Sequence, residues 1–159
     1  MAVTRRGLKL PATYAAYGGG VKAGVLAGAT YPEENIKSAK TGESFPDPRA
    51  GLPVASIAMA LEYGVGQNHP RPFMQQTANE QRKSWSNAIC KLLVGGMPVH
   101  EALMTVGQIM KEDIRDTINA WPADNAESWA EIKGFNKGLI QTGHLSNSIE
   151  SALYATDEE

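Results

Sequence analysis

Side chains between residues 21 and 31 alternate with a period of two. Valine, alanine and tyrosine occupy one set of positions, and lysine, glycine and threonine occupy most of the other. This alternation is typical of a strand with one buried face. Because so many of its residues are small, we expect a helix to lie close against this strand.

The segment 54–63 carries two patterns at once. Its odd-numbered positions from 55 to 63 all carry apolar or aromatic side chains, which is the alternation of a strand. Val54, Ile57 and Leu61, however, also fit one face of a helix. The segment is short, follows a proline, precedes a glycine-containing turn and ends in an aromatic residue, and these features favour a strand. Met59 is then expected in the core.

Two amphipathic helices are predicted in the middle of the chain. The first follows Pro72 and ends at Gly95 and Gly96, with apolar residues three and four positions apart along its length. The second begins at about Pro98 and stops at Pro122. A link this short predicts that the two helices pack antiparallel.

Two polar segments are predicted to be long loops. Residues 32–53 hold four prolines without a periodic pattern, and residues 33–52 are expected to be an extended loop that is either mobile or in contact with a partner. Residues 123–143 form the second loop, with one helical turn around residues 126–132. The last apolar segment, residues 145–154, is expected to be an edge strand.

This order of elements predicts an α+β fold, in which a small antiparallel sheet carries two long helices on one face. A chain of 159 residues can bury a substantial core, so residues 1–159 are interpreted as a single domain. Fifteen lysine and arginine residues against 17 acidic residues leave a net charge of −2. A protein that grips nucleic acid through many phosphates needs a basic excess, so this class of protein is disfavoured.

The single cysteine, Cys90, excludes a disulfide within the chain and indicates a reducing compartment. The uncharged segments 23–32 and 50–61 are shorter than the roughly 20 apolar residues that span a bilayer, so no membrane contact is expected. Positive charges near the start could mimic a signal peptide, but Pro11 and the glycines at 18–20 interrupt the apolar run that such a peptide needs. We therefore expect synthesis in the cytoplasm.

No catalytic or metal-binding motif is assembled in the sequence. His69, His100 and His144 have no second histidine or cysteine at the spacing of a metal site. The acidic residues between positions 112 and 116 have basic neighbours, which is typical of a solvent-exposed helix face. We therefore predict no enzyme activity, no metal site and no cofactor.

Several stretches of sequence, taken in order, resemble one protein family. They are residues 25–32, residues 54–64 with the run Glu62-Tyr63-Gly64, residues 70–73 with the run Arg71-Pro72-Phe73, and residues 132–149 with the run Thr142-Gly143-His144-Leu145. Their succession resembles the neck and tail-completion proteins of tailed bacteriophages, and it extends over residues 21–154. Each stretch is short and would not be specific by itself. The resemblance therefore depends on their order, Glu-aromatic-Gly, then Arg-Pro-Phe, then Thr-Gly-x-Leu.

The resemblance implies a structural virion protein that is assembled in the host cytoplasm. Members of this family form rings around the DNA channel where the head connector meets the tail. The implied partners are further copies of the chain in a homo-oligomeric ring, the head connector, and the tail terminator or tail tube. DNA would pass without sequence-specific binding. Two alternatives remain: a tail-tube terminator or baseplate-side ring protein, and a small phage-encoded hydrolase.

Two sets of residues are candidates for specific roles. Contacts with neighbouring subunits are expected from the two loops, at Glu43, Phe45, Asp47, Arg49, Lys133, Phe135 and Lys137. A structural role at a strand-to-helix corner is expected for Glu62, Tyr63, Arg71, Pro72 and Phe73. The chain departs from the family pattern in its longer loop at residues 33–52, and in Gly138, where that pattern leads us to expect proline.

Overall fold

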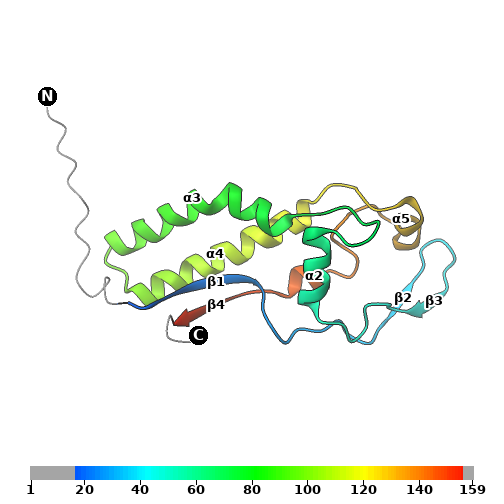
Figure 1. Cartoon of the computed structure of the whole chain (residues 1–159), viewed down its shortest axis with the longest axis horizontal. Helices are drawn as coiled ribbons and strands as arrows, with labels where there is room; N and C mark the ends of the chain where they lie inside the picture. The colour runs from blue at the N-terminus through cyan, green and yellow to red at the C-terminus, as the bar shows by residue number, and fades with distance from the viewer. Residues whose placement is uncertain (1–16, 156–159) are drawn as a thin grey trace, which may run out of the picture.

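A computed structural model describes residues 17–155 of the chain (Figure 1). In chain order the elements are β1 (Gly19–Val25), β2 (Asn35–Lys37), β3 (Ser44–Pro46), α2 (Val54–Tyr63), α3 (Phe73–Val94), α4 (Val99–Ala120), α5 (Glu127–Lys133), α6 (His144–Asn147) and β4 (Ile149–Ala155). The helices α3 and α4 have 22 residues each and form an antiparallel pair, as the sequence predicts (Figure 1).

Three layers are stacked along most of the molecule. Helix α3 lies on α4, and α4 lies on the sheet that β1 and β4 form (Figure 1). The two strands are antiparallel, with Gly19 opposite Ala155 and Val25 opposite Ile149. The fold is therefore α+β with two long helices on one face of a small antiparallel sheet, which confirms the predicted fold class.

Helix α4 approaches the sheet closely because a glycine faces it. A Cβ atom at Gly107 would lie 2.7 Å from Cγ2 of Val21 and 3.2 Å from Oγ of Ser151, so a larger residue would push the helix away from the strands. The buried residues of α4 are Ala102, Val106, Gly107, Ile114 and Ile118. The helix expected to lie close against the first strand is thus α4.

The segment 54–63 is the helix α2, so the strand prediction is wrong. Val54, Ala58 and Glu62 are its buried residues, and their spacing of four places them on one helix face. Met59 lies outside the core, with 64% of its surface exposed. The third buried position is a glutamate, and a search for apolar periodicity does not count a glutamate as buried.

Two further expectations for the first half of the chain are corrected. The alternating segment forms a strand only as far as Val25, because the chain turns at Gly28, where φ is +104° and a side chain would be strained. Residues 33–52 are not irregular throughout, because β2 and β3 pair as a short antiparallel hairpin. Ile36 in β2 is buried and gives this hairpin an inward side.

In the second half, α5 lies where the sequence predicts a helical turn. The last strand begins at Ile149 rather than at Leu145, because α6 occupies the residues just before it. The main core lies where α2, α6 and the ends of α3 and α4 meet. Its buried members are Tyr31, Val54, Ala58, Phe73, Ile114, Ile118, Leu139, Leu145 and Ile149.

Candidate functional site

The two segments predicted as loops meet at one end of the molecule, opposite the turn between α3 and α4 (Figure 1). The amide of Ala39 donates a hydrogen bond to the carbonyl oxygen of Ile132 at 2.8 Å, and Lys40 forms an ion pair with Glu131. Residues far apart in the sequence therefore form one surface. We call this region, residues 31–53 and 122–145, the loop end.

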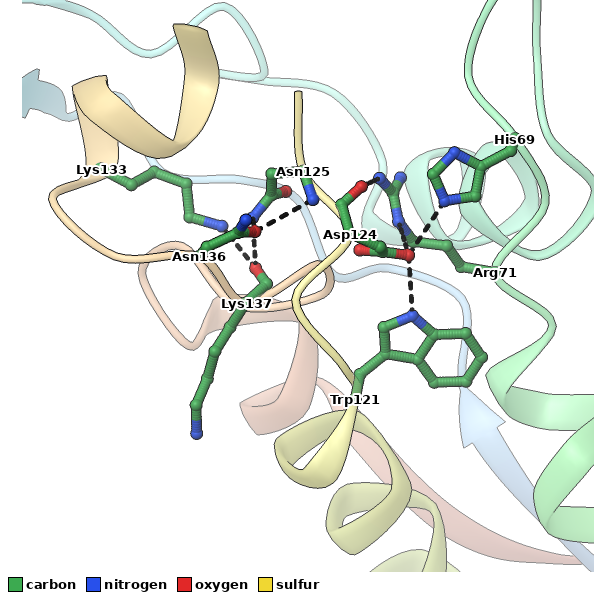
Figure 2. Close-up of polar contacts among 8 residues, drawn as sticks. All are labelled: His69, Arg71, Trp121, Asp124, Asn125, Lys133, Asn136 and Lys137. Carbon is green, nitrogen blue, oxygen red and sulfur yellow. Dashed lines mark hydrogen bonds and ion pairs between the residues drawn. The ribbon is translucent and has the colours of Figure 1, made fainter. Parts of the chain in front are cut away.

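Asp124 joins the loop end to the turn between α2 and α3 (Figure 2). Its Oδ2 accepts hydrogen bonds from Nε of Arg71 at 2.8 Å and from Nε1 of Trp121 at 3.0 Å, and Nε2 of His69 lies 3.0 Å away. Burial favours a higher pKa for Asp124, but the hydrogen bonds from His69, Trp121 and Arg71 together outweigh burial and lower this pKa below its usual value. Asp124 is therefore an anion at neutral pH.

Gly138 packs directly against this carboxylate. A Cβ atom at Gly138 would lie 1.7 Å from Oδ1 of Asp124 and 2.9 Å from Cδ1 of Trp121. Neither alanine nor proline fits in that space. Gly138, where the resemblance leads us to expect proline, is therefore the residue that permits this contact.

Side-chain amides hold the rest of the second loop beside Asp124 (Figure 2). Oδ1 of Asn136 accepts hydrogen bonds from the main-chain and side-chain nitrogens of Asn125, at 3.0 and 3.1 Å. The main-chain oxygen of Lys137 accepts from Nδ2 of Asn125 at 2.9 Å and from Nζ of Lys133 at 2.6 Å. These bonds give residues 133–138 a defined conformation.

The residues predicted to fix a corner lie between α2 and α3, so the corner joins two helices rather than a strand and a helix. Glu62 is buried, and its carboxylate oxygens accept hydrogen bonds from the amides of Met74 and Gln75, both at 2.9 Å. These amides belong to the first turn of α3 and have no partner within the helix. Phe73 is fully buried, whereas Tyr63 is 64% exposed.

Asp47 and Arg49, predicted as subunit contacts, pair with each other. Arg49 donates from Nε to Oδ1 of Asp47 at 2.9 Å and from Nη2 to Oδ2 at 2.7 Å, and its guanidinium lies 4.5 Å from the ring centre of Tyr31. The hydrogen bond from Arg49 lowers the pKa of Asp47, against the opposing effect of burial. Asp47 is 6% exposed, so its carboxylate stabilises the loop that carries Glu43 and Phe45.

The candidates in the second loop remain closer to the surface. Phe135 is 42% exposed, and Nζ of Lys133 lies 4.9 Å from its ring centre. Burial lowers the pKa of Lys133 to about 8, and the positive charges of Arg49 and Arg71 contribute to the decrease. The structure thus brings Arg49, Lys133 and the corner residue Arg71 near one another.

A cavity of about 410 Å³ lies among these cations, between the loop end and α2. Its polar lining includes Arg49, Arg71, Lys133 and Gln141, and Leu61 and Trp129 contribute apolar surface. Nε2 of Gln141 is buried and has no hydrogen-bond partner within residues 17–155. The cavity therefore combines positive charge with an unused hydrogen-bond donor.

Sequence reasoning missed two of the residues that build this site. Asp124 is an isolated acidic residue in a polar segment, and no pattern in the sequence distinguishes it from a surface residue. Trp129 carried no signal beyond its large aromatic side chain. Gln141 lies inside one of the stretches that carry the resemblance to the phage family. The sequence could therefore point to this segment, but not to a buried amide that faces a cavity.

A second hollow, of about 520 Å³, lies beside α2 and the start of α3 and is lined largely by apolar side chains, including Met59, Tyr63 and Met74. Within residues 17–155, no three histidine, cysteine, aspartate or glutamate residues gather closely enough to hold a metal ion. In the same part of the chain, no helix has the length and apolar character needed to cross a bilayer.

No family model matches the chain, and no curated protein or solved structure matches it either.

Proposed function

We propose that this chain is a structural subunit that forms a ring at the head–tail junction of a tailed bacteriophage, around the channel that DNA crosses. The observation that carries this proposal is the meeting of two of the family-like runs in one cavity. Arg71, from Arg71-Pro72-Phe73, lines the same cavity as Thr142, Gly143 and Leu145, from the later run. The run Glu62-Tyr63-Gly64 does not line this cavity, because Glu62 and Tyr63 line the second hollow; only Leu61, the residue before the run, belongs to the cavity lining.

This arrangement supports a structural role for the runs. The amide of Arg71 donates a hydrogen bond to the carbonyl oxygen of Leu61 at 2.7 Å, and Nε2 of His144 lies 3.0 Å from the carbonyl oxygen of Thr30. The runs therefore hold the loop end in a fixed orientation on the layered core. A fixed orientation of contact loops is what a ring subunit requires, because a ring closes only at a defined angle between neighbours.

The shape of the subunit also supports a ring. The molecule is elongated, and its two ends present different surfaces: the loop end at one side and the turn between α3 and α4 at the other (Figure 1). Contacts between different surfaces of identical subunits generate rings when the rotation closes. The net charge of −2 suits a channel for DNA, because a strongly basic ring would retain the passing genome.

A nonsense mutation in the phage gene tests the proposal. Electron microscopy of the lysate is expected to show DNA-filled heads and separate tails that do not join, and the intact gene supplied on a plasmid is expected to restore joined virions. Complete virions in the mutant lysate would contradict the proposal. Complete virions that also remain trapped in unlysed cells would favour the hydrolase instead.

A further inference from the structure

Helix α5 forms one wall of the cavity at the loop end. Trp129 and Lys133 both line the cavity, and their spacing of four places them on one face of this helix. Val65, in the turn after α2, also lines the cavity and is 61% exposed. The wall therefore presents an indole ring, an exposed apolar side chain and an ammonium group.

The ammonium group of Lys133 has no carboxylate partner within residues 17–155. The other two cations of the cavity, Arg49 and Arg71, each form an ion pair with an aspartate. Nζ of Lys133 donates a hydrogen bond to the main-chain oxygen of Lys137 instead. Burial lowers the pKa of Lys133 to about 8, so a carboxylate brought to it from outside would stabilise its charged form.

The cavity wall also holds one buried acceptor and one buried donor that are unpaired. Oδ1 of Asp124, which packs against Gly138, is the acceptor, and Nε2 of Gln141 is the donor. Neither atom has a hydrogen-bond partner within residues 17–155. A simple anion supplies acceptors alone, whereas a protein segment supplies amides, carbonyl oxygens and carboxylates together. The cavity therefore suits a protein segment.

The turn between α3 and α4 has the features that such a segment requires. It comprises residues 95–98 and lies at the end of the molecule opposite the loop end (Figure 1). Gly95 and Gly96 make it narrow, and Val94 beside them is 61% exposed. The amides in the first turn of α4 have no acceptor inside the helix, and the turn also presents carbonyl oxygens.

The charges beside this turn complement those of α5. Lys91 and Glu101 are exposed, have no ion pair within residues 17–155, and lie on adjacent antiparallel helices. Each is three residues from its helix end, so the two backbones are about 8 to 10 Å apart there. Glu127 and Lys133 are the two ends of α5, about 9 Å apart along its axis. Glu101 can therefore pair with Lys133 while Lys91 pairs with Glu127.

We propose that the turn between α3 and α4 of one copy docks in the loop-end cavity of the next copy. This inference rests on the proposed ring and names the contact that joins neighbouring subunits. The contact brings Glu101 to the ammonium group of Lys133 and covers Val94 with the apolar wall. It joins two different surfaces of identical chains, so it repeats from copy to copy, as a closed ring requires.

Nuclear magnetic resonance on two full-length variants tests this contact, because each variant keeps only one half of it intact. The receptor is labelled with ¹⁵N and carries Val94→Gln and Glu101→Gln at its own turn. The unlabelled partner carries Lys133→Met and has an intact turn. The indole N–H signal of Trp129 in the receptor is expected to shift saturably with partner added up to about 1 mM, which half-saturates even a millimolar contact.

Three controls make the result specific. Adding Val94→Gln and Glu101→Gln to the partner is expected to weaken binding at least tenfold, whereas Glu80→Gln, at an exposed position of α3, is expected to leave it unchanged. The spectrum of each variant shows whether it is folded, and the wild type serves as the partner if Lys133→Met folds poorly. Absence of a shift, or an equal shift with the altered turn, would overturn the inference.

The two proposals fail in different ways. Unjoined heads and tails in the nonsense mutant, together with no shift of the Trp129 signal, would support the neck role and overturn the docking of the turn. A saturable shift together with complete virions in the nonsense mutant would support the contact between copies and overturn the neck role.

Discussion

The Asp124 carboxylate links three segments that lie far apart in the sequence: the end of α4, the turn before α3 and the loop that contains Gly138. A charge that is partly buried is tolerated here because Arg71, Trp121 and His69 supply donors to it. Loss of one partner costs more than the net contribution of the pair, because the other partner is left buried without compensation. The cluster therefore stabilises one conformation of the loop end.

Substitution of Gly138 tests whether this packing matters. Gly138→Ala is expected to lower the free energy of unfolding by about 1 to 3 kcal/mol, because the new methyl group displaces the Asp124 carboxylate. In an Asp124→Ala background the same substitution should cost less, since the two nearest atoms, both in the Asp124 carboxylate, are gone while the contact with Trp121 remains. Urea unfolding of the four proteins of this double-mutant cycle measures the coupling. Strictly additive effects would show that the two residues do not interact.

Acid sensitivity follows from the lowered pKa of Asp124. Between its usual value of 3.8 and the lower value in the folded chain, the unfolded state binds more protons, so stability falls as pH decreases through this range. Asp124→Asn is expected to be less stable than the wild type at pH 7 and to lose less stability on acidification. Urea unfolding between pH 3 and pH 7 measures both effects. Asp116→Asn, on the exposed side of α4, should retain the wild-type slope.

Single residues were the hardest features to interpret from the sequence. Asp47 and Arg49 were selected as subunit contacts because they are charged residues in a long loop, yet they pair with each other at 2.7 Å. Residues two positions apart in an irregular segment can face one another only in particular backbone conformations, and the sequence does not specify which one occurs. Gly138 and Asp124 depend on contacts across 14 positions, which no local pattern encodes.

At the scale of elements, length decided what could be predicted. Helices α3 and α4 repeat their pattern over 22 residues, and glycine and proline mark their ends, so both were predicted correctly. The strands β2 and β3 have three residues each and α6 has four, which is too short for any period to appear. In α2 the short apolar run fits both periods. The bonds that accompany the burial of Glu62 come from Met74 and Gln75 in α3, outside the segment, so the segment's own pattern does not reveal them.

The start of α3 provides a test at this scale. Glu62→Ala removes both acceptors of the Met74 and Gln75 amides, and we expect the free energy of unfolding to fall by about 1 to 3 kcal/mol. The control is Glu80→Ala, at an exposed position of α3, which should change the free energy of unfolding by less than about 0.5 kcal/mol. Thermal unfolding followed by circular dichroism compares the two variants. Equal stability of both would show that Glu62 does not cap α3.

At the scale of the whole molecule, the layers are thin. Beyond Thr77, helix α3 contributes no buried residue, because this part of the helix packs on α4 and no described element within residues 17–155 covers its other side. The sheet has only two strands in this part of the chain, so β1 and β4 each keep one open edge. Such a subunit leaves surface for neighbours at its sides as well as at its ends.

The orientation of neighbours can be tested with the native cysteine. Cys90 is exposed on α3 near its turn into α4, and Thr41 is exposed at the tip of the hairpin in the loop end. If subunits join the loop end of one copy to the opposite end of the next, the variant Thr41→Cys treated with a short bismaleimide during ring assembly should give a ladder of covalent oligomers. The wild type and the variant Thr41→Cys with Cys90→Ala carry one cysteine each and should give no ladder, because their like ends do not meet. Covalent dimers of the wild type at high yield would instead indicate a symmetric pair joined through α3, and a symmetric pair cannot extend into a ring through that contact.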